Sequence, residues 1–386
     1  MAIKVVFCLP SLHFVGGMEK VLTIKANYFT DVFNYEVIIV LTDSKEKAPF
    51  FTLSNKINVV NFDINFEKIR HYPVFIRIFP YLYKQLIYRK RLTKLLMEIR
   101  PDITVSMLRR EINFITWIKD GSKKVGEMQF NRLNYRDFDI SDRFALIKGF
   151  LSKLWMKQLI FNLKRTDMFV VLSKEDMERW PEIKNITVIH NPIDKLSDKI
   201  SDCSSKKVIA AGRFVEQKGF DMLIDSWKIV NRKHPDWTLS IYGEGDKALY
   251  NKQIANNGLE GSCTTNEVQR DLTEMFCESS IFAFSSRFEG FALILTEAMS
   301  FGVPPVAFSC PCGPKELITN GINGLLVTPG NITEFAEKIC YLIENEEIRK
   351  EMGRSARERS KDFTIDKLAQ DWDNLFKSLL KTNQIT

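Results

Sequence analysis

The chain alternates short runs of apolar, often β-branched residues with longer segments whose apolar residues recur at helical spacing. In the first half, the runs that predict strands are 3–9, 36–41, 57–62, 103–107, 124–128, 168–172 and 186–189. The segments that predict helices between them are notably 17–31, 68–99 and 150–165. Strands and helices in alternation are typical of a parallel sheet that is covered on both faces.

The same pattern begins again after a polar, serine-rich segment at 193–207, which is typical of a linker. Strands are then predicted at 208–211, 238–242, 281–284, 305–308 and 325–327. Helices are predicted at 220–232, 247–257, 291–302, in two stretches over about 331–361, and at 365–381. The sequence therefore predicts an α/β protein with two Rossmann-like, doubly wound domains, 1–192 and 193–364, facing each other across a cleft. Residues 365–386 are predicted to form a C-terminal helix that crosses back to the first domain.

Composition agrees with a globular protein of two domains. The chain has 386 residues, which is long for a single core, with 45% hydrophobic and 27% charged residues. Its 55 Lys and Arg exceed 48 Asp and Glu by seven. This mild basic bias suits phosphorylated small molecules or an anionic membrane surface, and is weaker than that of a dedicated nucleic-acid binder.

Cysteine usage and apolar runs bear on the compartment. Seven cysteines are scattered without a CxxC pair, which disfavours zinc and dithiol redox sites and favours a reducing compartment. The apolar stretch at the N-terminus is too short for a signal peptide, and no run approaches the 18 residues of a membrane span. We therefore expect a cytoplasmic protein.

Loops that follow strands are the candidate sites, because ligands of doubly wound sheets bind at the carboxyl ends of strands. Gly16 and Gly17 follow the first strand and precede a helix, where the backbone can approach an anion closely. They do not form GxGxxG, so a nicotinamide cofactor is disfavoured, and a plain strand–helix turn explains them equally well. Gly243 and Gly245 end a later strand, where a tight turn is the simpler explanation.

Two cations open the second domain. Arg213 and Lys218 flank a loop between a predicted strand and a predicted helix. Together with the free N–H groups of that helix end they can converge on a diphosphate. A surface salt-bridge pair is the alternative interpretation.

Two carboxylates lie eight residues apart in SSRFEGFALILTEAM. Glu289 falls in a predicted loop, and Glu297 about two turns into the predicted helix. Eight helical residues turn through about 800°, so the two side chains would point only about 80° apart, into one cleft. A carboxylate beside an apolar run needs donors, and sugar hydroxyls would serve. On spacing alone, a helix cap or an arginine partner is the more common explanation.

Several of these segments together resemble a known family. The segments are GRFVEQKGFDMLIDSW, SIYGEGD, SSIFAFSSRFEGFALILTEAMSFGVPPVAFSCPCGPKELI and NGLLVTPGN, over roughly 206–345, with GGMEK near the start. In this order and spacing they are similar to the retaining glycosyltransferases of family 4, also called group 1. These enzymes have the GT-B fold and use nucleotide-activated sugars.

The resemblance implies a role for each matching residue. Arg213 and Lys218 would hold the donor diphosphate and stabilise the leaving group, and no metal or other cofactor would be needed. Glu289 would contact the donor sugar near the reacting centre, and Glu297 would accept hydrogen bonds from the ribose hydroxyls. The remaining donor-binding positions would be Gly16, Gly17, Gly243, Gly290, Phe291, Ala292 and Leu293.

Three features depart from the family or compete with it. Residues 261–265 lack the usual hydrophobic strand, which appears shortened or lost near the expected nucleotide base. Gln129 stands where some relatives place a histidine. Residues 137–139 spell Asp-Phe-Asp, the acidic triplet of metal-dependent glycosyltransferases of another fold, but no predicted strand leads into them, so we interpret it as a coincidence.

A basic, aromatic-rich segment at 66–100 is the candidate for holding the acceptor. It carries nine Lys and Arg against two Glu, and Pro73 and Pro80 are expected to break it into shorter pieces. Together with 148–165 it predicts contact with a membrane surface, which would suit a lipid-linked acceptor. The alternative is a helix pair whose apolar face belongs to the core and whose lysines are merely solvated.

The sequence therefore predicts a retaining enzyme that transfers a hexosyl or N-acetylhexosaminyl group from a UDP-sugar. The expected acceptor is a surface glycan, as in capsule, O-antigen or exopolysaccharide assembly, and the expected location is peripheral on the inner face of the plasma membrane. One alternative is a catalytically silent subunit that binds nucleotide sugars within a glycan-assembly complex. Another is a GT-B sugar-nucleotide epimerase, whereas a phosphorylase would need a longer chain.

Overall fold

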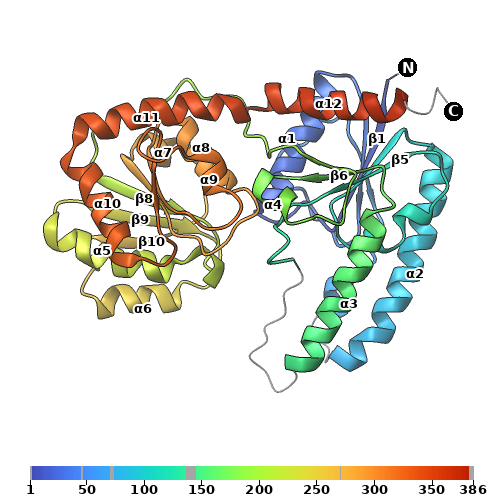
Figure 1. Cartoon of the computed structure of the whole chain (residues 1–386), viewed down its shortest axis with the longest axis horizontal. Coiled ribbons are helices and arrows are strands. Elements are labelled where there is room, and N and C mark those ends of the chain that lie inside the picture. The colour runs from blue at the N-terminus through green and yellow to red at the C-terminus, as the bar shows by residue number, and fades with distance from the viewer. Residues whose placement is uncertain (1, 45–46, 70–73, 136–144, 270, 382–386) are drawn as a thin grey trace. The chain divides into compact units, whose positions relative to one another are not determined.

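The structure is a computed structural model that describes residues 2–44, 47–69, 74–135, 145–269 and 271–381. The chain divides into two compact units, each built around one β-sheet (Figure 1). The N-terminal unit contains residues 1–192 and 368–386, and the C-terminal unit contains residues 193–367.

The sheet of the N-terminal unit has seven parallel strands in the order β3-β2-β1-β4-β5-β6-β7. Its strands are β1 (Lys4–Leu9), β2 (Glu36–Leu41), β3 (Asn58–Asn61), β4 (Ile103–Ser106), β5 (Lys123–Glu127), β6 (Met168–Val171) and β7 (Ile186–Val188). The direction of winding reverses between β1 and β4. In such sheets this switch point, at the carboxyl ends of the strands, is where ligands bind.

Helices cover both faces of this sheet and supply its core. They are α1 (Gly17–Asp31), α2 (Val74–Ile99), α3 (Ala145–Leu163), α4 (Lys174–Glu178) and α12 (Ile365–Lys381), with short 3-10 turns η1 (Phe66–Ile69), η2 (Glu111–Asn113) and η3 (Ile115–Trp117). The last helix packs on α1, because Phe376 contacts Phe29 edge-on at 5.9 Å between ring centroids. The ammonium of Lys25 lies 4.4 Å from the ring centroid of Trp372 and forms a fully buried ion pair with Glu127.

The C-terminal unit repeats the architecture with six parallel strands in the order β10-β9-β8-β11-β12-β13. Its strands are β8 (Lys207–Ala211), β9 (Thr238–Gly243), β10 (Cys263–Glu267), β11 (Ile281–Phe284), β12 (Pro305–Phe308) and β13 (Leu325–Val327). Its helices are α5 (Phe220–Lys233), α6 (Ala248–Asn256), α7 (Thr273–Cys277), α8 (Leu293–Ser300), α9 (Pro314–Leu317), α10 (Ile332–Glu344) and α11 (Glu346–Ser360), with 3-10 turns η4 (Glu216–Lys218) and η5 (Lys361–Phe363). The switch point of this sheet lies between β8 and β11.

The strand predicted to be shortened or lost near 261–265 is present, so the prediction of its loss was wrong. It is β10, which pairs in parallel with β9 from Cys263 to Glu267. The strand lies at the edge of the sheet, and Cys263 is its only buried residue. An edge strand can be polar, so it lacks the apolar run by which a central strand is recognised.

The predicted break of the basic segment at Pro80 was also wrong. Helix α2 runs from Val74 to Ile99 with Pro80 inside it. The proline removes one backbone donor, which would have reached the carbonyl of Ile76, and Ile76 itself is exposed. Water can satisfy that carbonyl, so the helix continues through the proline. Pro73 lies outside the described residues.

Candidate functional site

The loops that follow β8 and β11 are pressed against each other. Gly219 starts α5 in the left-handed conformation, with φ 64°, and a Cβ there would lie 2.1 Å from the carbonyl oxygen of Ser285. The hydroxyl of Ser285 donates to the carbonyl of Lys218 at 2.9 Å, and the amide of Arg287 donates to the carbonyl of Gln217 at 2.8 Å. Only glycine allows this approach, which fixes the two loops at the switch point.

Lys218 and Glu289 form an ion pair across these loops. Nζ of Lys218 lies 2.7 Å from Oε1 of Glu289, and the two side chains are only 14% and 9% exposed. The pair forms because β8 and β11 are neighbouring strands, although 71 residues separate the partners. Burying an ion pair rarely stabilises a fold more than an apolar contact would, so a pair at this edge favours a role in binding.

The other two charged candidates differ in exposure. Arg213 is exposed in the same β8–α5 loop, and its side chain makes no hydrogen bond or ion pair with any residue that the structure describes. Glu297 is buried on α8 with 8% of its surface exposed. The structure thus offers an exposed cation in the loop and a buried carboxylate on the helix.

Helix α8 begins later than predicted, and this corrects the angular argument for the two glutamates. It starts at Leu293, after Ala292 in the left-handed conformation with φ 66°. Glu297 is therefore its fifth residue, and residues 289–292 are not helical. The separation of about 80° does not apply. A left-handed alanine is uncommon and marks a strained turn before the helix.

Residues 290–293 form the turn into α8. Phe291 and Ala292 are buried, whereas Gly290 and Leu293 are half-buried. A Cβ on Gly313 would lie 3.1 Å from the carbonyl oxygen of Phe291, so the loop after β12 packs on this turn. Gly243 is needed for a different contact, since a Cβ there would lie 1.9 Å from the carbonyl oxygen of Gly212.

Sequence reasoning missed a buried thiol beside the ion pair. Cys310 follows β12 and is fully buried. Burial raises the pKa of its thiol, the charge of Glu289 raises it further, and that of Lys218 lowers it. Cys310 therefore lies close enough to the Lys218–Glu289 pair to sense both charges, and its thiol stays protonated and neutral. Its position directly after a predicted strand was the available signal.

In the N-terminal unit, Gly16 and Gly17 lie at the start of α1. Gly16 is the N-cap residue, and a Cβ on it would meet the Glu19 carboxylate at 2.1 Å. A Cβ on Gly17 would meet no atom within 4 Å among the described residues. The loop is therefore tight at one glycine and open at the next.

Gln129, at the histidine position of some relatives, belongs to a polar network. Its Nε2 donates to Oε1 of Glu127 at 2.6 Å, and Nδ2 of Asn191 donates to its Oε1 at 2.9 Å. Glu127 in turn holds the buried Lys25. The glutamine is thus fixed in place beyond the carboxyl end of β5.

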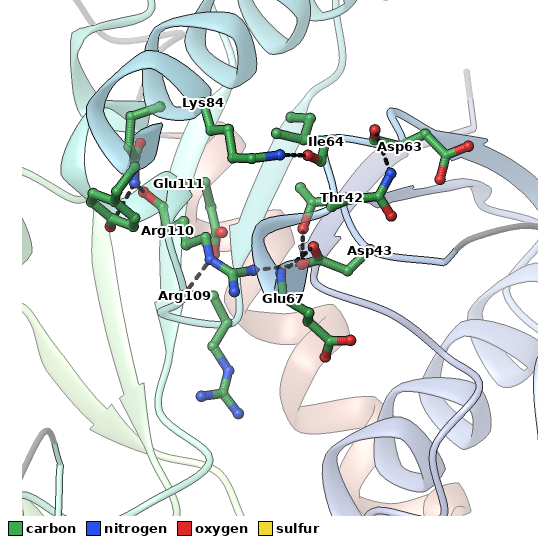
Figure 2. Close-up of polar contacts among 12 residues, drawn as sticks. Thr42, Asp43, Asp63, Ile64, Glu67, Lys84, Arg109, Arg110 and Glu111 are labelled. Carbon is green, nitrogen blue, oxygen red and sulfur yellow. Dashed lines mark hydrogen bonds and ion pairs between the residues drawn. The ribbon is translucent and has the colours of Figure 1, made fainter. Parts of the chain in front are cut away.

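A second polar cluster lies at the carboxyl ends of β2 and β4, and Figure 2 shows it. Nη1 of Arg110 lies 2.6 Å from Oδ2 of Asp43, whose side chain is fully buried. Thr42 donates its hydroxyl to the same carboxylate at 2.9 Å. No motif in the sequence marked this cluster.

Two expectations concern metals and membranes. Over the described ranges, no three His, Cys, Asp or Glu side chains are grouped to hold a metal ion. The Asp-Phe-Asp triplet at 137–139 lies outside those ranges, and the expectation of a metal-free reaction stays a prediction. Among the helices described, none is long and apolar enough to cross a membrane.

Comparison with known proteins gives three findings. Residues 195–359 match the family described as glycosyl transferases group 1. An uncharacterized glycosyltransferase of Haemophilus influenzae is 33% identical over 215 residues, which are 54% of this chain and 61% of that protein. The amylovoran biosynthesis glycosyltransferase AmsD of Erwinia amylovora is 25% identical over 377 residues, which are 96% of this chain and 99% of that protein.

Solved structures agree over nearly the whole chain. A mutant of S. aureus TarM, in complex with fondaparinux, alpha-GlcNAc-glycerol and UDP, superimposes with a TM-score of 0.76 at 17% identity, covering 97% of this chain and 99% of that one. Sucrose-phosphate synthase from Thermosynechococcus elongatus gives 0.79 at 14% identity, covering 98% and 100%. These likenesses confirm the predicted GT-B fold of two α/β domains with parallel sheets.

Proposed function

We propose, from the match of residues 195–359 to the family described as glycosyl transferases group 1, that the protein transfers a sugar from a UDP-sugar to a surface glycan. The observation that carries the proposal is the Lys218–Glu289 ion pair at the switch point of the matched domain. Relatives add support. AmsD is named for amylovoran biosynthesis, and another relative is a poly(ribitol-phosphate) alpha-N-acetylglucosaminyltransferase of Staphylococcus aureus. The assignment to family 4 within this group is part of the proposal.

In this proposal the donor diphosphate lies beside Lys218 and Arg213. The ammonium of Lys218 uses one N–H for Glu289 and has two more for phosphate oxygens. Arg213 is exposed on the same loop and adds a second, bidentate contact. Negative charge develops on the departing phosphate, so fixed cations at this point stabilise the transition state.

The two glutamates take different parts of the donor. Glu289 lies at the ion pair, where its second oxygen can accept a hydrogen bond from a sugar hydroxyl and face the positive charge that develops on the ring. Glu297 lies one turn inside α8 and is assigned to the ribose hydroxyls. The amides of residues 290–293 lie at the start of α8, where the helix favours an anion. Gly243 completes the proposed donor site in the C-terminal unit, and the donor contacts of Gly16 and Gly17 stay a prediction from the sequence.

We propose retention of configuration without a separate enzyme base. The leaving phosphate takes the proton of the acceptor hydroxyl on the same face of the sugar. Gln129, held by Glu127 and Asn191, then needs no acid–base function and can only position the substrate.

We propose that α2 and α3 contact the inner face of the plasma membrane, and that the acceptor is lipid-linked and held in that membrane. Figure 1 shows the N-terminal halves of both helices extending beyond the sheet. Exposed apolar residues gather in the N-terminal half of α2, namely Ile76, Ile78, Phe79, Leu82, Tyr83 and Leu86, and others lie along α3 at Leu154, Trp155 and Phe161. Exposed cations follow them on α2, namely Arg89, Lys90, Arg91 and Lys94, and the sequence from 74 to 97 contains no acid. The exposed apolar residues of α2 can enter an anionic bilayer, while Arg89, Lys90, Arg91 and Lys94, here called the basic collar, contact its headgroups.

A thermal-shift screen with UDP, GDP, ADP and their glucose derivatives tests the donor. UDP-N-acetylglucosamine is added to the set, and we expect UDP and either UDP-glucose or UDP-N-acetylglucosamine to raise the melting temperature most. Turnover of the donor with and without a saccharide acceptor separates the alternatives. An epimerase would convert the donor without an acceptor, and a silent subunit would bind it without any conversion. Absence of binding by every nucleotide would contradict the proposal.

A further inference from the structure

Two adjacent arginines follow β4, and their charges are compensated differently (Figure 2). Arg110 is fully engaged, because its Nη1 lies 2.6 Å from the buried Asp43 and its guanidinium lies 4.3 Å over the ring of Phe66. Figure 2 shows the side chain of Arg109 extending away from that pair.

The guanidinium of Arg109 has no acidic partner among the described residues. Its Nε is buried without a hydrogen-bond partner among those residues, and its guanidinium carbon lies 4.9 Å from the ring centroid of Phe130. Glu111 is nearby, but Oε1 of Glu111 accepts the hydroxyl of Ser106 at 2.6 Å and the backbone amide of Arg109 at 3.0 Å. The carboxylate of Glu111 therefore hydrogen-bonds to the loop, and it acts on the Arg109 guanidinium through charge without an ion pair.

A half-buried arginine without an ion-pair partner is costly, since burial disfavours the charged form and lowers the pKa of Arg109, and the nearby charges of Tyr135, Glu111 and Glu19 raise it only in part. A buried polar group without a hydrogen-bond partner calls for an explanation in a native protein, and a ligand that supplies the partner is one such explanation. The position of Arg109 supports a ligand. It follows β4 at the switch point of the N-terminal sheet, and Phe130 follows the neighbouring strand β5. The charge of Glu19, in the first turn of α1, also reaches Arg109, so the loop of Gly16 and Gly17 lies at the same edge.

We propose that Arg109 binds an oxyanion of the acceptor, a phosphate or a carboxylate, so that the acceptor is an anionic glycan. That the anion belongs to an acceptor rests on the proposed function, whereas the anion site itself consists of residues of the N-terminal unit alone. The planar guanidinium, already stacked on Phe130, presents its remaining N–H groups as a fork that matches either oxyanion. Arg110 and Asp43 buttress the loop and are positioning residues.

Anion binding to three variants tests this site. Arg109→Met keeps contact with Phe130 and removes the charge, and Arg109→Lys keeps the charge without the fork. Arg165→Met is the matched control, because Arg165 stacks on Trp117 at 4.0 Å but precedes β6, at the opposite edge of the sheet. Inorganic phosphate and glucuronate are titrated separately by calorimetry, with and without saturating UDP.

We expect Arg109→Met to weaken binding of at least one anion by tenfold or more, Arg109→Lys to weaken it less, and the control to bind as wild type does. The preferred anion tells a phosphate-bearing acceptor from a uronic-acid acceptor. Arg109→Met should melt at the same or a higher temperature, because it removes an unpaired buried donor, whereas loss of a merely structural residue would lower it.

Equal anion binding by wild type and Arg109→Met would overturn the site, and so would no binding of either anion by wild type. UDP binding is measured on the same samples. Intact UDP binding with no effect of Arg109 rejects this inference alone, whereas failure of wild type to bind any nucleotide rejects the proposed function.

Discussion

At the residue scale, Lys218 and Glu289 show how charges far apart in sequence acquire a joint role. Each is an ordinary exposed-type residue in its own loop. Adjacency of β8 and β11, with Gly219 at their contact, brings them to 2.7 Å. The buried thiol of Cys310 lies close enough to sense the charges of both residues. The chemistry therefore depends on strand order as much as on residue type.

Replacing Lys218 by alanine is expected to lower turnover strongly. The change removes a cation beside the leaving phosphate and leaves Glu289 without this ion-pair partner. Loss of one such electrostatic contact typically costs about 10²- to 10³-fold in kcat. Steady-state kinetics with the donor found in the nucleotide screen measure it. Lys252→Ala, at an exposed lysine on α6, is the control, and an unchanged kcat in Lys218→Ala would remove Lys218 from the site.

Glu297→Gln is expected to weaken nucleotide binding about tenfold, which is about 1.4 kcal/mol. A neutral amide accepts weaker hydrogen bonds from ribose hydroxyls than a carboxylate does. Calorimetric titration with UDP measures the change, and Glu260→Gln, at an exposed position, is the control. Wild-type affinity in Glu297→Gln would show that Glu297 only supports the fold.

The Arg132–Glu182 ion pair predicts a specific loss of stability in acid. The guanidinium donates to both carboxylate oxygens, at 2.6 and 2.8 Å, and these bonds lower the pKa of Glu182 from 4.5 to about 2. Because the folded pKa is the lower one, the stabilisation is present above pH 4.5 and is lost as the pH falls towards 2. Glu182 is 36% exposed, so solvent screening limits the effect to about 1 kcal/mol.

Urea unfolding of wild type and Glu182→Gln measures this effect. The free energies of unfolding should differ by about 1 kcal/mol at pH 7 and by about half of that at pH 3. A difference that is constant with pH would show that the carboxylate contributes by packing rather than by charge.

At the element scale, α2 is unusual because its apolar residues divide between two faces. Its buried residues Tyr88, Leu92 and Leu96 lie in the C-terminal half and face the core. Phe79, Leu82, Tyr83 and Leu86 repeat at helical spacing but are exposed, and Phe79 lies nine residues, about 180°, from Tyr88. The exposed stripe therefore points away from the core. The C-terminal half of α2 fits the interpretation as a core helix, and membrane contact by the exposed stripe stays a prediction.

The stripe predicts binding to anionic vesicles. Phe79→Ser combined with Leu86→Ser should weaken binding to phosphatidylglycerol vesicles by tenfold or more, since each buried side chain is worth about 1.5–3 kcal/mol. Phosphatidylcholine vesicles should bind wild type more weakly, because the basic collar then has no partner. Co-sedimentation measures both. Leu249→Ser, an equally exposed leucine on α6 of the other unit, is the control, and identical binding by all variants would exclude the stripe.

At the scale of the whole molecule, helix α12 packs on the N-terminal unit, from which it is separated in sequence by the other unit. Residues 368–386 belong to the N-terminal unit, although residues 193–367 form the other one. Tyr35 donates a hydrogen bond to Asp373, and the buried Lys25 lies under Trp372. The first unit is thus completed only after residues 193–367 of the other unit have been made.

Truncation after Lys367 is expected to unfold the N-terminal unit and leave the C-terminal unit folded. It removes Trp372 and Phe376, and losing each buried aromatic costs about 3–5 kcal/mol, a large part of the stability of an ordinary domain. Hydrogen exchange resolved by segment measures it. Truncation after Lys381 is the control, and protection of β1 and β4 in the shorter chain would contradict the expectation.

The sequence by itself determined the two parallel-sheet domains, because buried central strands leave continuous apolar runs. It also indicated a likeness to group 1 glycosyltransferases, because four motifs keep their order and spacing. It did not reveal β10, since an edge strand is polar, and it placed α8 too early, since the left-handed Ala292 is invisible in composition. The Lys218–Glu289 pair, the thiol of Cys310 and the half-buried Arg109 depended on tertiary structure. Strand order and burial decide which charged side chains find a partner, and neither can be predicted from the spacing of residues along the chain.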